Sequence, residues 1–297
     1  MTPETRTGLL AGLGAYVIWG LLPFYLRLLH GVPAADVLAH RILWSVLVVA
    51  LLIAALRGWQ RLGAALRQPR LLLLLLASAV CIAINWLVYT WAILNGHALD
   101  TSLGYFINPL VSVVFGVVLL GERLSRLQWA AVACAAAGVV VLTIAHGNLP
   151  MIAIALALSF GTYGLIRKQA AVDAATGLFI ETLMLAPVAL LWLLSLPKVQ
   201  TAGLAAWPGP LLALLMLGGV LTAAPLMLFG VAARRLKLST MGLMQYIAPS
   251  MVFLQAIFLF GEAIDPWQML AFAATWTGLA LYTLSLGRPV APAAQPR

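Results

Sequence analysis

Ionisable side chains inside apolar segments are the first candidates for function in this chain. Glu181 is its only acidic residue within such a segment, and His40 and Arg41 lie in another segment about 140 residues earlier. Charged groups in a membrane are costly and commonly mark gates or ion pathways. Arg41 and Glu181 each lie about 7 Å into their segments from opposite sides, so roughly 15 Å separates them along the membrane normal. We expect no direct contact, and two interpretations stay open: gate or ion-coupling groups at opposite mouths, or side chains that extend to lipid headgroups.

A second group of polar and aromatic residues surrounds two prolines in the middle of apolar segments. Pro109 and Pro249 each remove one backbone hydrogen bond and free the carbonyls of Tyr105 and Gln245. A freed carbonyl in lipid must find a partner or line a polar cavity. We predict a central cavity that is polar, aromatic and uncharged; in the alternative, its amides only link helices by hydrogen bonds. The predicted binding residues are Asn85, Tyr89, Tyr105, Asn108, Gln245 and Tyr246.

The sequence lacks the residue patterns that nucleotide binding, metal binding and nucleophilic catalysis require. It contains no phosphate-binding loop, no aspartate-rich pair suited to Mg²⁺ and a diphosphate, and no His, Cys and acid cluster with metal-ligand spacing. No serine and histidine stand out as a nucleophile and its base. We therefore expect no cofactor, no bound metal and no direct use of ATP.

The composition places these residues in lipid. The chain has 297 residues, of which 64% are hydrophobic and 8% charged, whereas a soluble domain carries about 25% charged residues. A helix needs about 20 apolar residues to cross a bilayer. We predict an all-α integral membrane protein with ten transmembrane helices, at residues 8–29, 36–56, 71–94, 101–120, 127–145, 150–169, 177–196, 210–231, 239–260 and 267–286.

The two halves of the sequence repeat each other loosely. Pro109 returns as Pro249, and Glu122, which we expect to face water, returns as Glu262 at the same offset. A half that crosses the bilayer five times ends on the opposite side, so the second half must be inverted, as in many secondary transporters. The predicted units are repeat 1 (8–145, spans 1–5), repeat 2 (150–286, spans 6–10) and a disordered C-terminal tail (287–297).

The distribution of basic residues predicts the orientation. The net charge of +9 comes from short clusters between apolar segments, which argues against a nucleic-acid partner. With the N-terminus in the cytoplasm, only Arg27 and Lys198 fall in outer loops, and most other Lys and Arg residues fall in inner ones. The positive-inside rule therefore predicts that both termini are cytoplasmic.

Several strings of the sequence resemble one known family. The strings are AHRILWS (39–45), NWLVYTWA (85–92), SLGYFINPL (102–110), GERLSRLQW (121–129), SFGTYGLIRK (159–168) and QYIAP (245–249). They are similar to the RarD family, in the EamA branch of the drug/metabolite transporter superfamily, over nearly the whole chain. The resemblance implies a bacterial inner-membrane transporter of two inverted five-helix EamA repeats, with its cavity near the six residues named above. The second repeat reads Ala248-Pro249 where the first reads Asn108-Pro109, so the two halves cannot contribute identical polar groups.

We therefore expect a secondary permease of the bacterial inner membrane that exports or exchanges a small polar or amphipathic metabolite or drug by alternating access. Its expected partners are the small-molecule substrate, the lipid bilayer and, where Glu181 couples transport, protons. The alternative is an integral-membrane enzyme acting on a lipid-linked substrate. Such an enzyme would need paired carboxylates, or a nucleophile and base, at one depth, and the sequence offers neither.

Overall fold

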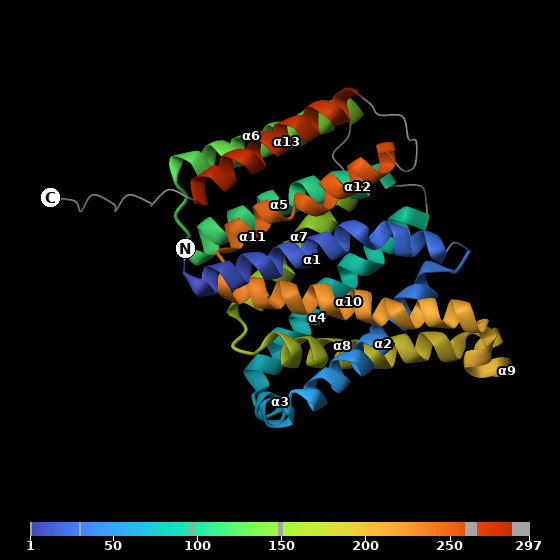
Figure 1. Cartoon of the computed structure of the whole chain (residues 1–297). Helices are drawn as coiled ribbons and strands as arrows, with labels where there is room; N and C mark the ends of the chain where they lie inside the picture. The colour runs from blue at the N-terminus through green and yellow to red at the C-terminus, as the bar shows by residue number, and fades with distance from the viewer. Residues whose placement is uncertain (1, 30, 95–97, 148–150, 259–265, 287–297) are drawn as a thin grey trace.

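The computed structural model describes residues 2–29, 31–94, 98–147, 151–258 and 266–286, and all regular structure in these ranges is helical (Figure 1). The helices are α1 (Pro3–Leu28), α2 (Ala34–Ala55), α3 (Trp59–Leu66), α4 (Pro69–Leu94), α5 (Ala98–Leu120), α6 (Arg126–His146), α7 (Met151–Gln169), α8 (Ala174–Ser195), α9 (Pro197–Ala202), the 3-10 helix η1 (Gly203–Ala206), α10 (Gly209–Arg235), α11 (Leu238–Met244), α12 (Ile247–Phe258) and α13 (Pro266–Leu286). The predicted tail at 287–297 lies outside the described residues.

The helices have the length and the surface of membrane-spanning segments. Within the described residues, α1, α2, α4, α6, α8 and α10 are long and apolar enough to cross a bilayer, by length and composition. Large apolar side chains also point outward; Val118, Ile144 and Phe258 are 70%, 75% and 78% exposed. Water would make such exposure costly, but lipid does not. These features are those of a multi-pass membrane protein.

The predicted span at 239–260 is interrupted in the structure. α11 ends at Met244 and α12 begins at Ile247, so Gln245 and Tyr246 form a turn between two shorter helices. The reason is Pro249, which has no N–H to donate to the Gln245 carbonyl and is tolerated in the first turn of a new helix. Pro109, in contrast, stays inside the continuous α5. The sequence predicted two matching kinks, but in the structure Pro109 lies within a continuous helix and Pro249 follows a break.

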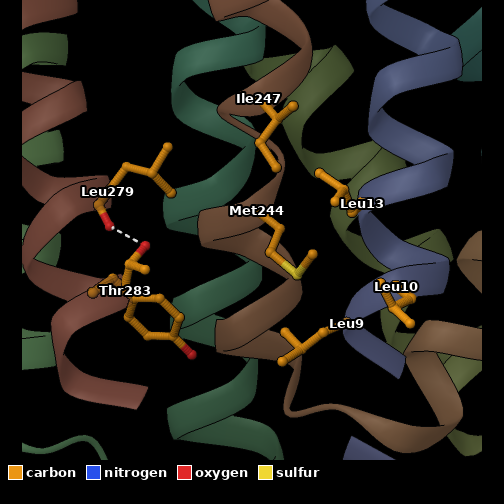
Figure 2. A pocket seen from close by; sticks show the side chains of 8 residues that line it. Leu9, Leu10, Leu13, Met244, Ile247, Leu279 and Thr283 are labelled. Atoms are coloured by element: carbon orange, nitrogen blue, oxygen red, sulfur yellow. Dashed lines mark hydrogen bonds between the residues drawn. The ribbon is translucent and has the colours of Figure 1, made fainter. Parts of the chain in front are cut away.

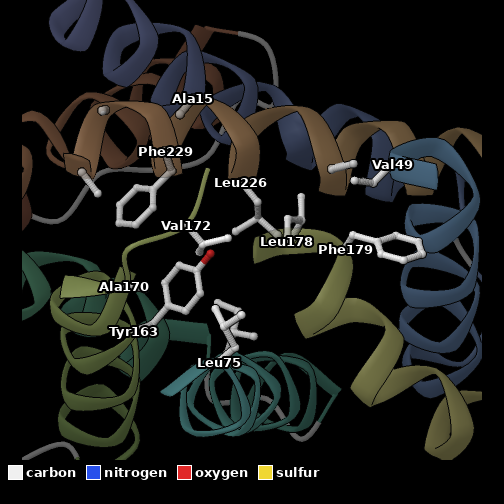
Figure 3. Packing of buried hydrophobic residues seen from close by; sticks show 14 of the residues in the cluster. Ala15, Val49, Leu75, Tyr163, Ala170, Val172, Leu178, Phe179, Leu226 and Phe229 are labelled. Carbon is white, nitrogen blue, oxygen red and sulfur yellow. The ribbon is translucent and has the colours of Figure 1, made fainter. Parts of the chain in front are cut away.

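Helices from the two halves of the chain interleave. α1 packs on α10 and α12, α2 packs on α8 and α10, and α4 packs on α7 and α8. α5 packs on α7 and α11, while α6 and α13 lie side by side at one edge of the bundle (Figure 1). The largest core cluster lies where these layers meet: Tyr163 and Phe229 stack with ring centroids 5.6 Å apart, near Leu75 and Leu178 (Figure 3).

Glu122 has a different role from the one predicted. We expected this residue to face water, but its carboxylate accepts hydrogen bonds from the backbone N–H groups of Leu238 (2.6 Å) and Ser239 (3.0 Å) and from the Ser239 hydroxyl (2.6 Å). The side chain is only 7% exposed, and Lys168 Nζ lies 3.9 Å away. A carboxylate stabilises the N-terminal end of a helix because it pairs with donors that the helix leaves free. Glu122 therefore ties the end of α5 to the start of α11; its counterpart Glu262 lies outside the described residues.

Glycines allow α2 and α10 to approach closely. A Cβ atom added to Gly219 would lie 2.5 Å from the Trp44 Cβ and 2.6 Å from the Trp44 carbonyl carbon. The Ser45 hydroxyl donates a hydrogen bond to the Gly219 carbonyl at 3.1 Å across the same contact. Small residues and hydrogen bonds of this kind hold membrane helices together, because lipid supplies little hydrophobic drive for their association.

Gly219→Ala is therefore expected to destabilise the protein by about 1–3 kcal/mol, since the added methyl group meets backbone that cannot move alone. The measurement is thermal unfolding of the purified protein in detergent. The matched control is Gly63→Ala in α3, where an added Cβ meets nothing within 4 Å and alanine favours a helix by about 1 kcal/mol. Equal melting temperatures for Gly219→Ala and the wild type would contradict the close contact between α2 and α10.

Candidate functional site

Glu181 lies in a buried ion pair. Its Oε1 atom is 3.4 Å from Nη1 of Arg167 in α7 and accepts a hydrogen bond of 2.6 Å from the Ser78 hydroxyl in α4. Glu181 is 1% exposed and Arg167 2% exposed. The structure thus contradicts the interpretation in which Glu181 extends to lipid headgroups, because protein groups surround it. It agrees with the expectation that Arg41 and Glu181 do not meet.

Arg167 belongs to this site, although the sequence analysis did not predict it as a site residue. Its side chain turns back into the bundle, where Nη2 donates to the Ala174 carbonyl at 3.3 Å. Gly177 and Gly230 make room for it; a Cβ on Gly230 would lie 2.8 Å from Arg167 Nη2. One signal could have found the pair: Arg167 ends one predicted span and Glu181 begins the next, so a short turn places both at the same depth.

Asp173 fixes the end of α8 that carries Glu181. Its carboxylate caps the helix, accepting hydrogen bonds from the Thr176 N–H at 3.0 Å and from the Thr176 hydroxyl at 2.7 Å. Burial raises the pKa of the Asp173 carboxyl, but the hydrogen bonds from Thr176, the nearby Arg61 charge and the Ala175 N–H together outweigh burial and leave the pKa below its ordinary value. The cap is therefore charged at neutral pH, when it best stabilises the helix end.

The structure brings only some of the six predicted binding residues together. Tyr89 and Tyr105 meet edge to face, with ring centroids 5.9 Å apart. Asn85 instead links α4 to α7, donating from Nδ2 to the Leu156 carbonyl at 3.0 Å and to the Ser159 hydroxyl at 3.1 Å. For Asn85, the structure therefore agrees with the alternative interpretation, in which the amide links two helices by hydrogen bonds.

The other three predicted residues are buried around α5 and the break after α11. Asn108 and Gln245 are each 7% exposed, and among the described residues Asn108 Oδ1 and Gln245 Oε1 have no hydrogen-bond partner. Tyr246 is fully buried in an apolar cluster with Val113 and Tyr282. The two orphaned amide oxygens are acceptors that a polar ligand or water could satisfy.

Arg41 changes the electrostatic character of the predicted cavity. Its Nε atom donates to the Thr222 hydroxyl at 2.8 Å, and its Cζ atom lies 5.6 Å from the centroid of the Trp86 ring. Tyr89 and Tyr105 lie near the guanidinium. We predicted an uncharged cavity, but a positive charge lies beside the aromatic pair. The long Arg41 side chain points into the bundle rather than toward the membrane surface.

His40, next to Arg41 in the chain, belongs to a separate cluster. Its Nδ1 atom accepts a hydrogen bond from Trp44 Nε1 at 3.1 Å, and its ring meets that of Trp207 edge-on with centroids 4.4 Å apart. Beside it, the buried Asp36 carboxylate pairs with Lys198 Nζ at 2.7 Å. This cluster joins the start of α2 to the segment of α9 and η1.

One pocket lies away from Glu181, Arg41 and His40. It has a volume of about 270 Å³ and lies between α1, the pair α11–α12, and α13. Its lining is apolar apart from the hydroxyl groups of Tyr282 and Thr283. Figure 2 shows Leu9, Leu13, Met244 and Ile247 facing it, with the Thr283 hydroxyl bonded to the Leu279 carbonyl at 2.8 Å. In the described part of the chain, no group of three or more His, Cys, Asp or Glu residues could hold a metal ion.

The buried ion pair yields a double-mutant test. Glu181→Leu should destabilise the protein by about 3–5 kcal/mol, because it leaves the Arg167 charge buried without a counter-charge, whereas adding Arg167→Met should recover most of that loss. Thermal unfolding in detergent measures both, with Glu4→Gln at the exposed N-terminus as control. Additive losses in the double variant would mean that the two side chains are not coupled.

Comparison with known proteins gives consistent results. Residues 6–144 match the model of the EamA-like transporter family. The chain is 44% identical to "Protein RarD" of Escherichia coli over 281 residues, 95% of each chain. It is 46% identical to an uncharacterized transporter of Pseudomonas aeruginosa over 298 residues, 99% of each chain.

Two further similarities extend this result. A second Pseudomonas aeruginosa protein, "Chloramphenicol-sensitive protein RarD", is 36% identical and is matched over 92% of both chains. One solved crystal structure has a TM-score of 0.72 at 22% identity and covers 94% of this chain and 97% of that one, which shows a shared fold. The chain belongs to the RarD group of the EamA-like transporter family, in the drug/metabolite transporter superfamily.

Proposed function

We propose that this membrane transporter is a secondary permease of the bacterial inner membrane, which exports or exchanges a small polar or amphipathic metabolite or drug by alternating access. Family membership supports the transport function. The substrate class and the mechanism are proposals from the arrangement of its helices and buried polar groups.

The proposed architecture is ten crossings in two inverted repeats. Repeat 1 (8–145) comprises α1, α2, α4, α5 and α6; repeat 2 (150–286) comprises α7, α8, α10, the pair α11–α12, and α13. Both termini are cytoplasmic in this proposal. The N-terminus and α11 lie at one end of the bundle and α9 at the other in Figure 1, which supports this threading. This threading agrees with the distribution of basic residues, since Lys198 in α9 is one of the few basic residues predicted to lie on the outer side.

One observation carries the mechanism: several polar contacts inside the bundle join the two proposed repeats. Ser78 in α4 bonds to Glu181 in α8, Asn85 in α4 bonds to Ser159 in α7, and Arg41 in α2 bonds to Thr222 in α10. Few, directional contacts across an interface can exchange partners when one half rocks against the other, whereas a continuous apolar interface would resist that motion. The repeats therefore meet at a surface suited to alternating access.

Glu181 and His40 are the proposed gate or coupling groups at opposite mouths. Glu181 lies about 10 Å along α8 from the proposed cytoplasmic end, and His40 lies at a similar depth along α2 from the outer end. Protonation of Glu181 would remove the charge that Arg167 pairs with, and so would loosen the contact among α4, α7 and α8. Protons are the proposed coupling ion on this basis.

The substrate is first found by a metabolite-export screen of cells with and without the protein. The hit is then tested in proteoliposomes with an imposed pH gradient, where Glu181→Gln should abolish gradient-driven uptake while counterflow exchange persists. Glu4→Gln, at the exposed N-terminus, is the control. Unchanged gradient-driven uptake in Glu181→Gln would rule out coupling through this carboxylate and would favour facilitated exchange. An export screen and counterflow assays that detect no solute would contradict the transport proposal.

A further inference from the structure

The Arg41 guanidinium lies inside the bundle, where no described residue supplies a counter-charge. Its Nε atom donates to the Thr222 hydroxyl at 2.8 Å, which is its one hydrogen bond to the described residues, and that hydroxyl in turn donates to the Gly218 carbonyl at 2.7 Å. Among the side chains that the structure describes, no carboxylate forms an ion pair with Arg41. A guanidinium has five N–H donors in a fixed fork, so most of the binding capacity of Arg41 is unused.

Arg41 is surrounded by aromatic groups that still leave accessible surface. Its Cζ atom lies 5.6 Å from the Trp86 ring centroid, and Tyr89 and Tyr105 lie nearby. Tyr105 is 42% exposed although it contacts Tyr89 and lies near the guanidinium, and Arg41 itself is only partly buried. Arg41 and Tyr105 therefore keep side-chain surface that the rest of the protein does not cover.

A second polar group in the same place lacks a partner. The Tyr25 side chain is 5% exposed, yet its hydroxyl makes no hydrogen bond to any described residue. It lies beside Arg41: a Cβ added to Gly218 would contact the Tyr25 hydroxyl and would come within 2.9 Å of Arg41 Cγ. A buried hydroxyl without a partner is costly, and a bound anion would accept its hydrogen bond.

We propose that Arg41 and Tyr25 bind the negatively charged group of the substrate, and that the substrate is an amphipathic monocarboxylate whose apolar part lies against Trp86, Tyr89 and Tyr105. This inference rests on the proposed transport function. It gives Arg41 a binding role in place of the gating or coupling role predicted from the sequence.

The charge balance at the site selects a monoanion. The neighbouring cation Lys198 is already paired with Asp36, and His40 is held between Trp44 and Trp207, so Arg41 supplies the one unpaired positive charge among the described residues of this region. A carboxylate matches the guanidinium fork with two oxygens and neutralises one charge, whereas a phosphate monoester would leave excess negative charge in a low-dielectric site. A lipid phosphodiester shares the monoanionic chemistry, and the experiment must separate it from a soluble substrate.

The test is equilibrium binding to the full-length protein in phosphatidylcholine nanodiscs, followed by tryptophan fluorescence and thermal shift. The probes are matched acid and amide pairs: phenylacetate, 3-phenylpropionate and indole-3-acetate, each with its uncharged amide. We expect the wild type to bind at least one acid tenfold or more tightly than its amide. Arg41→Gln should abolish this preference, and Arg41→Lys should retain part of it because the charge remains without the fork. Arg123→Gln, in an exposed loop, is the control.

Three results would overturn the proposal: no preference for acids in the wild type, no binding of any acid, or an undiminished preference in Arg41→Gln. Should Arg41→Gln fail to fold, Thr222→Val serves instead, and it should weaken acid binding several-fold because Arg41 loses its fixed acceptor. Repeating the assay with phosphatidylglycerol in the nanodiscs separates the sources of the anion. Equal acid binding in both lipids supports a soluble substrate, whereas its loss with phosphatidylglycerol assigns Arg41 to a lipid phosphate and overturns the proposal.

The binding assay also separates this proposal from the proposed transport function. Acid binding that depends on Arg41, without transport of the same acid in proteoliposomes, would sustain the anion site and contradict transport. Transport of a neutral solute that is unchanged in Arg41→Gln would sustain transport and overturn the anion site.

Discussion

In a lipid-solvated bundle, each charged or hydrogen-bonding group must find its partner within the protein, and this constraint organises the whole molecule. Glu122 satisfies it by capping α11, and Asp36 satisfies it by pairing with Lys198. Glu181 does so with Arg167 and Ser78, which draws three helices together at one point. Arg41 stands apart, since it uses one donor and leaves its charge unmatched among the described residues. That exception is the reason to regard it as part of a binding site.

The same constraint separates the parts of the molecule that hold it together from those that can move. The aromatic cluster of Tyr163 and Phe229, on two helices of the second half, offers dense packing without polar groups that could exchange partners. The polar contacts, in contrast, lie between helices that belong to different halves of the chain. A conformational change that exchanges these few contacts would leave the dense packing intact. The division of roles is therefore consistent with rigid units that rock about a polar interface.

The sequence predicts the helical class well, because apolar segments of spanning length have few alternatives to helix in lipid. It does not predict side-chain partners, because these depend on which helices become neighbours. Asn85 was assigned to a cavity and instead meets Ser159, and Arg167 was not predicted as a site residue but meets Glu181. The break at Gln245 was predicted only as a kink, since a proline permits either outcome and tertiary packing chooses between them. The sequence placed Arg41 near the start of its helix, but only the structure shows that its side chain points into the bundle.

The central claim is that the two halves of the chain cross the membrane in opposite senses, because alternating access about their interface depends on it. Single cysteines at Arg67, after α3, and at Lys237, after α10, test it directly in a background without Cys81 and Cys134. A membrane-impermeant thiol reagent is applied to intact cells and to inverted membrane vesicles. Inverted halves predict that both positions react only in inverted vesicles, while a cysteine at Gln200 in α9 reacts only in intact cells. Labelling of Arg67→Cys and Lys237→Cys from different sides of the membrane would contradict the account.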